Sequence, residues 1–164
     1  MQVDKEGKGA PLARILVVED DADIRQVLCL YLQYSHFDVR EASDGQAAID
    51  MIPEYCPDLM VLDIMMQPVD GWEVLHWLRA RRMNPPLPVL LLTARYQPEE
   101  QLQGFEEGAI EYLTKPTQPA IIVERVRTIL KLSAEQRRML QRKRIDEQRS
   151  TLARITPSPD KFLR

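Results

Sequence analysis

Four short apolar runs in this chain each end at a polar residue. The runs and the residues that follow them are 15–18 with Glu19-Asp20-Asp21, 59–62 with Asp63, 89–92 with Thr93, and 112–114 with Lys115. Short apolar runs bounded by turn residues predict strands buried on both faces of a parallel sheet, with helices on either side. Ligands bind beyond the carboxyl ends of such strands, so we expect these polar residues to converge there. Carboxylates, a hydroxyl and an ammonium at one edge suit a divalent cation and a phosphoryl group, and predict an aspartate phosphorylation site.

Composition favours one domain with an appendage. The chain has 164 residues and 45% hydrophobic content, which is enough for a single packed core. No apolar stretch approaches the ~20 residues needed to cross a bilayer. The polar segment from Met1 to Pro11 lacks the apolar core of a signal peptide. We therefore expect a cytoplasmic protein without a membrane partner.

Charge is distributed unevenly along the chain. The net charge is −3, but residues 133–164 hold nine Lys and Arg against four Asp and Glu. The preceding part of the chain is therefore acidic and the tail is basic. Phosphate contacts need a basic surface, so the acidic part argues against direct binding of nucleic acid.

Helical patterns separate the expected strands. Apolar residues at helical spacing occur within 24–32, 47–52, 74–78, 102–105 and 122–130, and residues 39–42 form a further short strand. We expect helix caps at Ser43, Asp70 and Thr117. Alternating strands and helices with right-handed crossovers predict an α/β fold with a doubly wound, five-stranded parallel sheet of the flavodoxin-like strand order 2-1-3-4-5.

Residues 13 to about 132 resemble the receiver domain of bacterial two-component response regulators. That family carries an acidic pair after its first strand, an aspartate after the third, a Thr or Ser after the fourth and a Lys-Pro after the fifth. The matching residues here are Glu19, Asp20, Asp63, Thr93, Lys115 and Pro116. The resemblance covers about four fifths of the chain, and four motifs in the right order make it specific.

The resemblance implies a role for each of these residues. Asp63 would be the phosphoacceptor, attacking a phosphoryl group carried by a sensor histidine kinase or a histidine phosphotransfer protein to form an aspartyl phosphate. Lys115 would pair with the phosphoryl group, and the Thr93 hydroxyl would donate to one of its oxygens. The chain would be a self-phosphorylating and self-dephosphorylating signalling phosphoprotein rather than a turnover enzyme.

A magnesium site is the only cofactor site that the resemblance implies. Glu19 and Asp20 would hold Mg²⁺ together with one Asp63 oxygen and the backbone carbonyl of Met65. A hard cation that takes six oxygen ligands suits this set.

Tyr112 stands where the family carries a switch aromatic. The resemblance implies that on phosphorylation Thr93 moves toward the phosphoryl group and Tyr112 rotates inward. The surface of the fourth helix, fifth strand and fifth helix then changes for a protein partner.

The tail is expected to be helical. No glycine or proline occurs from Ala120 to Thr156, so the fifth helix is expected to continue to about residue 155 before a Pro-rich end. The organisation expected is a flexible N-terminal tail over 1–12, a receiver domain over 13–132 and a basic helical extension over 133–164. We expect the fifth helix and the tail to contact a second copy or a partner protein.

Three other functions are compatible with parts of the sequence: a phosphotransferase, a DNA-binding regulator and a piece of a larger protein. Haloacid dehalogenase-like phosphotransferases carry a second aspartate two residues after the nucleophile, where this chain has Met65, which argues against that class. The residues after the receiver are too few for a winged-helix DNA-binding domain. The open alternative is a receiver piece of a larger multidomain regulator or hybrid kinase whose output module is absent.

Overall fold

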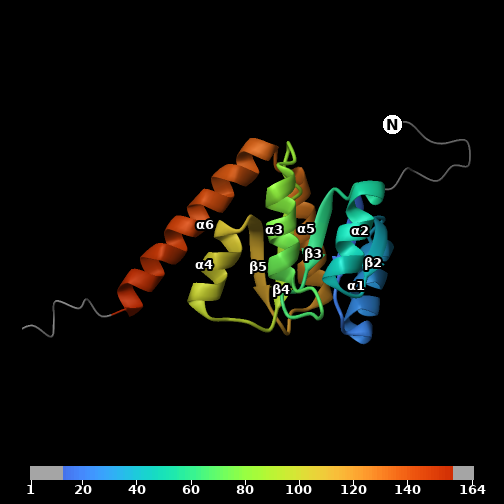
Figure 1. Cartoon of the computed structure of the whole chain (residues 1–164), viewed down its shortest axis with the longest axis horizontal. Helices are drawn as coiled ribbons and strands as arrows, with labels where there is room; N and C mark the ends of the chain where they lie inside the picture. The colour runs from blue at the N-terminus through green and yellow to red at the C-terminus, as the bar shows by residue number, and fades with distance from the viewer. Residues whose placement is uncertain (1–12, 157–164) are drawn as a thin grey trace, which may run out of the picture.

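The computed structural model describes residues 13–156 of the chain. Its centre is one parallel sheet with the strand order β2-β1-β3-β4-β5, which confirms the predicted order (Figure 1). The strands are β1 (Arg14–Val18), β2 (Asp38–Ala42), β3 (Leu59–Leu62), β4 (Val89–Thr93) and β5 (Ala109–Thr114).

The described residues form six helices. They are α1 (Ala22–Tyr34), α2 (Gly45–Tyr55), α3 (Gly71–Arg81), α4 (Pro98–Glu106), α5 (Pro119–Lys131) and α6 (Ala134–Ile155). Five lie on the two faces of the sheet, and α6 lies beside α4. One apolar cluster joins α2, α3 and α4 to the sheet, with members such as Ile52, Leu75 and Phe105. A second cluster joins α1 and α5 to the other face, with Leu32 and Val126. Because both faces are covered, the central strands are buried throughout, as the apolar runs predict.

Two of the predicted helix caps are wrong by one residue. Asp44, not Ser43, caps α2, because its carboxylate accepts the Ala47 N–H at 2.8 Å. Thr117 uses its hydroxyl to donate to the carbonyl at the end of β5, which leaves Gln118 as the residue before α5. The Asp44 side chain therefore replaces the predicted cap of α2, whereas the Gln118 side chain makes no cap hydrogen bond to α5. The cap predicted at Asp70 is confirmed.

The tail is a helix, as predicted, but it does not continue the fifth helix. α5 ends at Lys131, and Leu132 is extended, with φ −79° and ψ 142°. Ser133 then caps a new helix, because its hydroxyl accepts the Gln136 N–H while the Gln136 side chain accepts the Ser133 N–H. This capping box turns the chain, and α6 runs back beside α4 (Figure 1).

The face of α6 that meets the domain mixes apolar and polar side chains. Leu140 and Ile145 pack against the two core clusters. Gln141 donates to the Phe105 carbonyl at 2.7 Å, and Gln148 donates to the Pro98 carbonyl at 3.2 Å. α6 has no fully buried side chain. In this structure the tail therefore contacts its own domain. The predicted contact with a second copy or a partner protein stays a prediction.

No helix within residues 13–156 combines the length and the apolar character that crossing a membrane requires.

Candidate phosphoacceptor site

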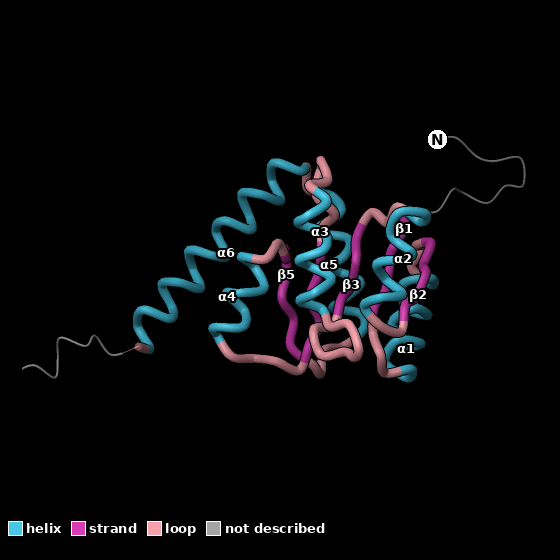
Figure 2. The backbone as a smooth tube through the Cα atoms, viewed as in Figure 1, coloured by secondary structure: helices cyan, strands magenta, loops and turns pink. Residues whose placement is uncertain are grey.

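The sheet register brings three carboxylates together. Val18 of β1 pairs with Leu62 of β3, so Glu19 and Asp63 leave the sheet side by side. Asp63 is held there because its N–H donates to the Val18 carbonyl at 3.0 Å. Glu19, Asp20 and Asp63 each offer an oxygen, and these oxygens lie within 4.8 Å of one another. Figure 2 shows the loops that carry the site along the lower edge of the sheet.

Lys115 brings a cation to these carboxylates from β5. Its Nζ donates to Glu19 Oε2 at 2.6 Å and to Asp63 Oδ2 at 3.0 Å. Burial alone would lower the pKa of Lys115, but the hydrogen bonds to Glu19 and Asp63 outweigh burial and raise it. The ammonium therefore stays charged beside the phosphoacceptor candidate.

Glu19 is almost fully buried, with 2% of its surface exposed. Burial raises the pKa of Glu19 to about 7, and the neighbouring Asp63 charge adds to this, although Lys115 acts against it. A proton therefore competes for this carboxylate near neutral pH.

The two expected switch residues lie on adjacent strands and meet at Arg95. Thr93 is fully buried, and its hydroxyl accepts the Arg95 N–H at 3.3 Å. The Tyr112 hydroxyl donates to the Arg95 carbonyl at 2.8 Å, and its ring packs near Phe105 with centroids 6.3 Å apart. Tyr112 is thus turned inward in this structure, with 8% of its surface exposed.

The loop after Asp63 is shaped by close backbone packing. The Met65 N–H donates to Asp63 Oδ1 at 3.1 Å. Gly71 begins α3 against this loop, and a Cβ at Gly71 would lie 2.5 Å from the Asp63 carbonyl oxygen. Gly71 therefore supports the site, and its place directly after the capping Asp70 is the sequence signal for this role. The Met65 carbonyl as a metal ligand stays a prediction.

Arg25 supports the site but was not singled out by sequence reasoning. Its guanidinium donates to the Glu19 carbonyl at 2.8 Å and lies 3.6 Å from a carboxylate oxygen of Glu41. Asp21, in contrast, caps α1 by accepting the Asp23 and Ile24 N–H groups. The acidic run after β1 thus divides between a helix cap and the carboxylate cluster.

The donor set fits a magnesium ion. The three clustered carboxylates are hard oxygen donors, and Asp20 is exposed, which leaves room for water to complete six ligands. Lys115 pairs with Glu19 and Asp63 but not with Asp20, the exposed member of the cluster.

Comparison with known proteins establishes the class. Residues 15–127 match the family model described as the response regulator receiver domain, and the chain belongs to this family. The resemblance seen in the motifs is thereby confirmed.

Curated relatives include a transcriptional regulatory protein and a response regulator. The chain is 38% identical over 118 residues to the phosphate regulon transcriptional regulatory protein PhoB of Escherichia coli, covering 72% of this chain and 52% of PhoB. It is 42% identical over 118 residues to the response regulator MprA of Mycobacterium avium, covering 72% of this chain and 51% of MprA. The chain therefore spans about half the length of the curated relatives it matches.

Solved receiver domains have the same fold. The receiver domain of the Francisella response regulator 1452 covers 73% of this chain and 97% of its own, with a TM-score of 0.68 and 32% identity. The BeF3-activated N-terminal receiver domain of Klebsiella pneumoniae RstA gives a TM-score of 0.66 and 32% identity, covering 73% of this chain and 99% of its own.

Proposed function

We propose that this chain accepts a phosphoryl group on Asp63 from the phosphohistidine of a sensor histidine kinase or a histidine phosphotransfer protein. The observation that carries this proposal is the Asp63 carboxylate, which is buried at 4% exposure, bonded to Lys115 and clustered with Glu19 and Asp20. Receiver family members are signalling proteins, so the output is a change of surface rather than a released product.

In the proposed transfer, one Asp63 oxygen attacks phosphorus and the phosphorus–nitrogen bond of the donor imidazole breaks, leaving its electron pair on nitrogen. Lys115 meets the negative charge on the phosphoryl oxygens, and the Thr93 hydroxyl donates to one of them. Mg²⁺, when held by Glu19, Asp20, Asp63 and the Met65 carbonyl, supplies further positive charge.

The proposed switch reaches the surface that α6 covers. Tyr112 packs on Phe105, whose carbonyl accepts the Gln141 side chain of α6. The residue before Tyr112, Glu111, is paired with Arg144 of α6 at 2.9 Å. If Thr93 moves toward a phosphoryl group, it leaves the Arg95 N–H, and Tyr112, which donates to the Arg95 carbonyl, moves as well. Movement of Tyr112 and β5 would then weaken both contacts to α6. Release of α6 would then uncover α4 and β5 for a protein partner.

A second candidate function is the receiver part of a longer regulator. It is favoured by the chain spanning about half of relatives such as PhoB and MprA. Because PhoB is a transcriptional regulatory protein, the expectation that this chain does not bind nucleic acid directly stays a prediction, as does its cytoplasmic location.

Phosphorylation is tested by incubating the full chain with a small phosphodonor, with Mg²⁺ or with a chelator. We expect intact mass to increase by one phosphate only with Mg²⁺. Asp63→Asn should abolish the increase, while Asp50→Asn, which changes an exposed aspartate on α2, should leave it unchanged. Equal labelling of Asp63→Asn and the unmodified chain would contradict the proposal.

A further inference from the structure

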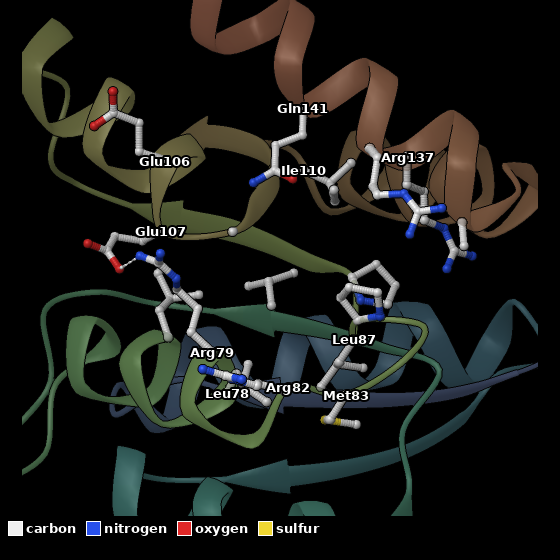
Figure 3. A pocket seen from close by; sticks show the side chains of 17 residues that line it. Leu78, Arg79, Arg82, Met83, Leu87, Glu106, Glu107, Ile110, Arg137 and Gln141 are labelled. Carbon is white, nitrogen blue, oxygen red and sulfur yellow. Dashed lines mark hydrogen bonds and ion pairs between the residues drawn. The ribbon is translucent and has the colours of Figure 1, made fainter.

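A cavity of about 300 Å³ lies where the first turns of α6 meet the end of α3 and the start of β4. This is the edge of the sheet opposite to the carboxylate cluster, because β4 begins at Val89 in the cavity and ends at Thr93 in the site. Figure 3 shows side chains from α3, α4, β5 and α6 facing one another around it. Its apolar lining comprises Leu75, Leu78, Leu87, Val89 and Ile110.

The polar lining of the cavity has more cations than anions. Its two carboxylates are already matched, since Glu107 binds Arg79 at 2.9 Å (Figure 3) and Glu106 binds Arg149 at 2.8 Å. The remaining charged lining consists of Arg82, Arg137 and Arg138. Within residues 13–156, no carboxylate lies within ion-pair distance of these three guanidiniums. Arg137 makes one bond, from its Nε to the Ile129 carbonyl at 3.2 Å.

We infer that this cavity binds a small organic anion, with an apolar body on the leucine-rich lining and a carboxylate or phosphate head on Arg137 and Arg138 of α6. The planar guanidinium fork matches either head group. A volume of about 300 Å³ is at the lower end of the range for small-molecule pockets. The lining therefore fits a short acyl chain or a single aromatic ring.

The pocket depends on the position of α6. Arg137, Arg138 and Gln141 all reach the cavity from α6, so they leave it if α6 undocks. A ligand that requires these residues must therefore favour the docked helix, and the docked helix must favour the ligand. A link between the ligand and phosphorylation would rest on the proposed function. Binding of the ligand to the pocket does not depend on the proposed function.

Binding is tested with the full chain by calorimetry and amide NMR, using octanoate, octyl phosphate, 1-octanol and inorganic phosphate as probes. We expect octanoate, octyl phosphate or both to bind and to shift amides around residues 75–89 and 134–141. The probe that binds more tightly shows whether the pocket prefers a carboxylate or a phosphate head group. Shortening octanoate to heptanoate should weaken binding about fourfold, the effect of one buried methylene.

Matched variants separate the head-group contacts from general charge. Arg137→Gln and Arg138→Gln should each weaken binding of the preferred probe by about tenfold, the effect of losing one charge-assisted hydrogen bond. Arg142→Gln, on an exposed part of α6 outside the cavity, should leave binding unchanged. Leu78→Trp, which fills the apolar part, should abolish it while circular dichroism confirms the fold.

Four results would overturn the inference. The first three are no binding of either amphipathic anion, equal binding of 1-octanol, and equal loss of binding in Arg142→Gln. Binding of inorganic phosphate as tight as that of octyl phosphate would also overturn it, because the apolar lining would then contribute nothing. None of these results depends on Asp63 accepting phosphate, so the two proposals fail separately.

Discussion

Arg144 of α6 donates from Nη2 to Glu111 Oε2 of β5 at 2.9 Å. Glu111 is 5% exposed and also accepts from Arg125 at 3.2 Å. The Arg144 guanidinium lies 5.8 Å from the centre of the Phe105 ring, which in turn packs on Tyr112. α6 is thus tied to β5 next to the proposed switch tyrosine.

Removing this tie should loosen α6 without unfolding the domain. Arg144→Met keeps a long apolar side chain but leaves Glu111 with Arg125 alone. We expect amide exchange over residues 134–155 to speed up by about tenfold or more, since losing one partner of a buried ion pair costs several kcal/mol. Arg142→Met, which changes an exposed arginine of the same helix, is the control. Unchanged exchange in Arg144→Met would show that Glu111 does not hold α6.

The carboxylate cluster should control metal binding. Replacing Glu19 and Asp20 together with Gln and Asn should weaken Mg²⁺ binding by at least tenfold, measured by titration calorimetry. The fold should survive, because the change removes crowded like charges. An Asp21→Asn variant, which keeps a capping side chain but removes its negative charge from the α1 N-terminus, should lower stability by at most about 1 kcal/mol and retain the metal affinity. Equal metal affinity in the double variant and the unmodified chain would refute this assignment.

Glu19 should make the metal-free protein sensitive to pH. Burial raises its pKa from 4.5 to about 7 in the folded state, so the folded protein keeps this proton after the unfolded chain has lost it. The resulting contribution to stability is fully present below pH 4.5 and is lost as pH rises through about 7. Apparent Mg²⁺ affinity should follow the opposite course and rise up to about pH 7, because the metal needs the ionised carboxylate. A Glu19→Gln variant should lose both dependences, as followed by denaturation and metal titration from pH 5 to 8.

Gly71 should be intolerant of a side chain. The Cβ of Gly71→Ala would lie 2.5 Å from the Asp63 carbonyl oxygen and 2.6 Å from Ile64 Cα, both backbone atoms. We expect a loss of about 1–3 kcal/mol in the free energy of unfolding, and slower phosphorylation as the Asp63 loop moves. Gly108→Ala is a useful comparison, because it meets no atom within 4 Å and is strained only by its φ of +118°. Wild-type stability and labelling in Gly71→Ala would contradict this role.

Thr93 should separate phosphorylation from its consequence. Thr93→Ala removes the hydroxyl but keeps the carboxylates and Lys115, so labelling of Asp63 should persist. The beryllofluoride-induced change in amide exchange over residues 97–155 should be at least halved. An identical change in the variant and the unmodified chain would show that the switch bypasses this hydroxyl.

The sheet and the gathering of the site were predictable because they depend on local patterns. Each buried strand is a continuous apolar run, and in parallel strands the residue after each run must lie at the same edge. The positions of Glu19, Asp63 and Lys115 follow from this rule alone.

The docking of α6 was not predictable in the same way. Helix formers continue through residues 120–155 without glycine or proline, and the break depends on the single capping box of Ser133 and Gln136. The contacts that hold α6 join residues 36 and 33 positions apart, Gln141 with Phe105 and Arg144 with Glu111. Glu111 looks like a surface charge in the sequence, and its burial is explained by its two arginine partners together with the Tyr112 N–H, which donates to its Oε1 at 3.1 Å.

Asp63 is the residue proposed to carry the phosphoryl group. The most direct test of this role is to treat the phosphorylated full chain with borohydride, which reduces an aspartyl phosphate to homoserine, and to locate that residue by peptide mass spectrometry. We predict homoserine at position 63, dependent on both phosphodonor and Mg²⁺. Homoserine at Asp20 or another carboxylate, with position 63 unmodified, would contradict the account.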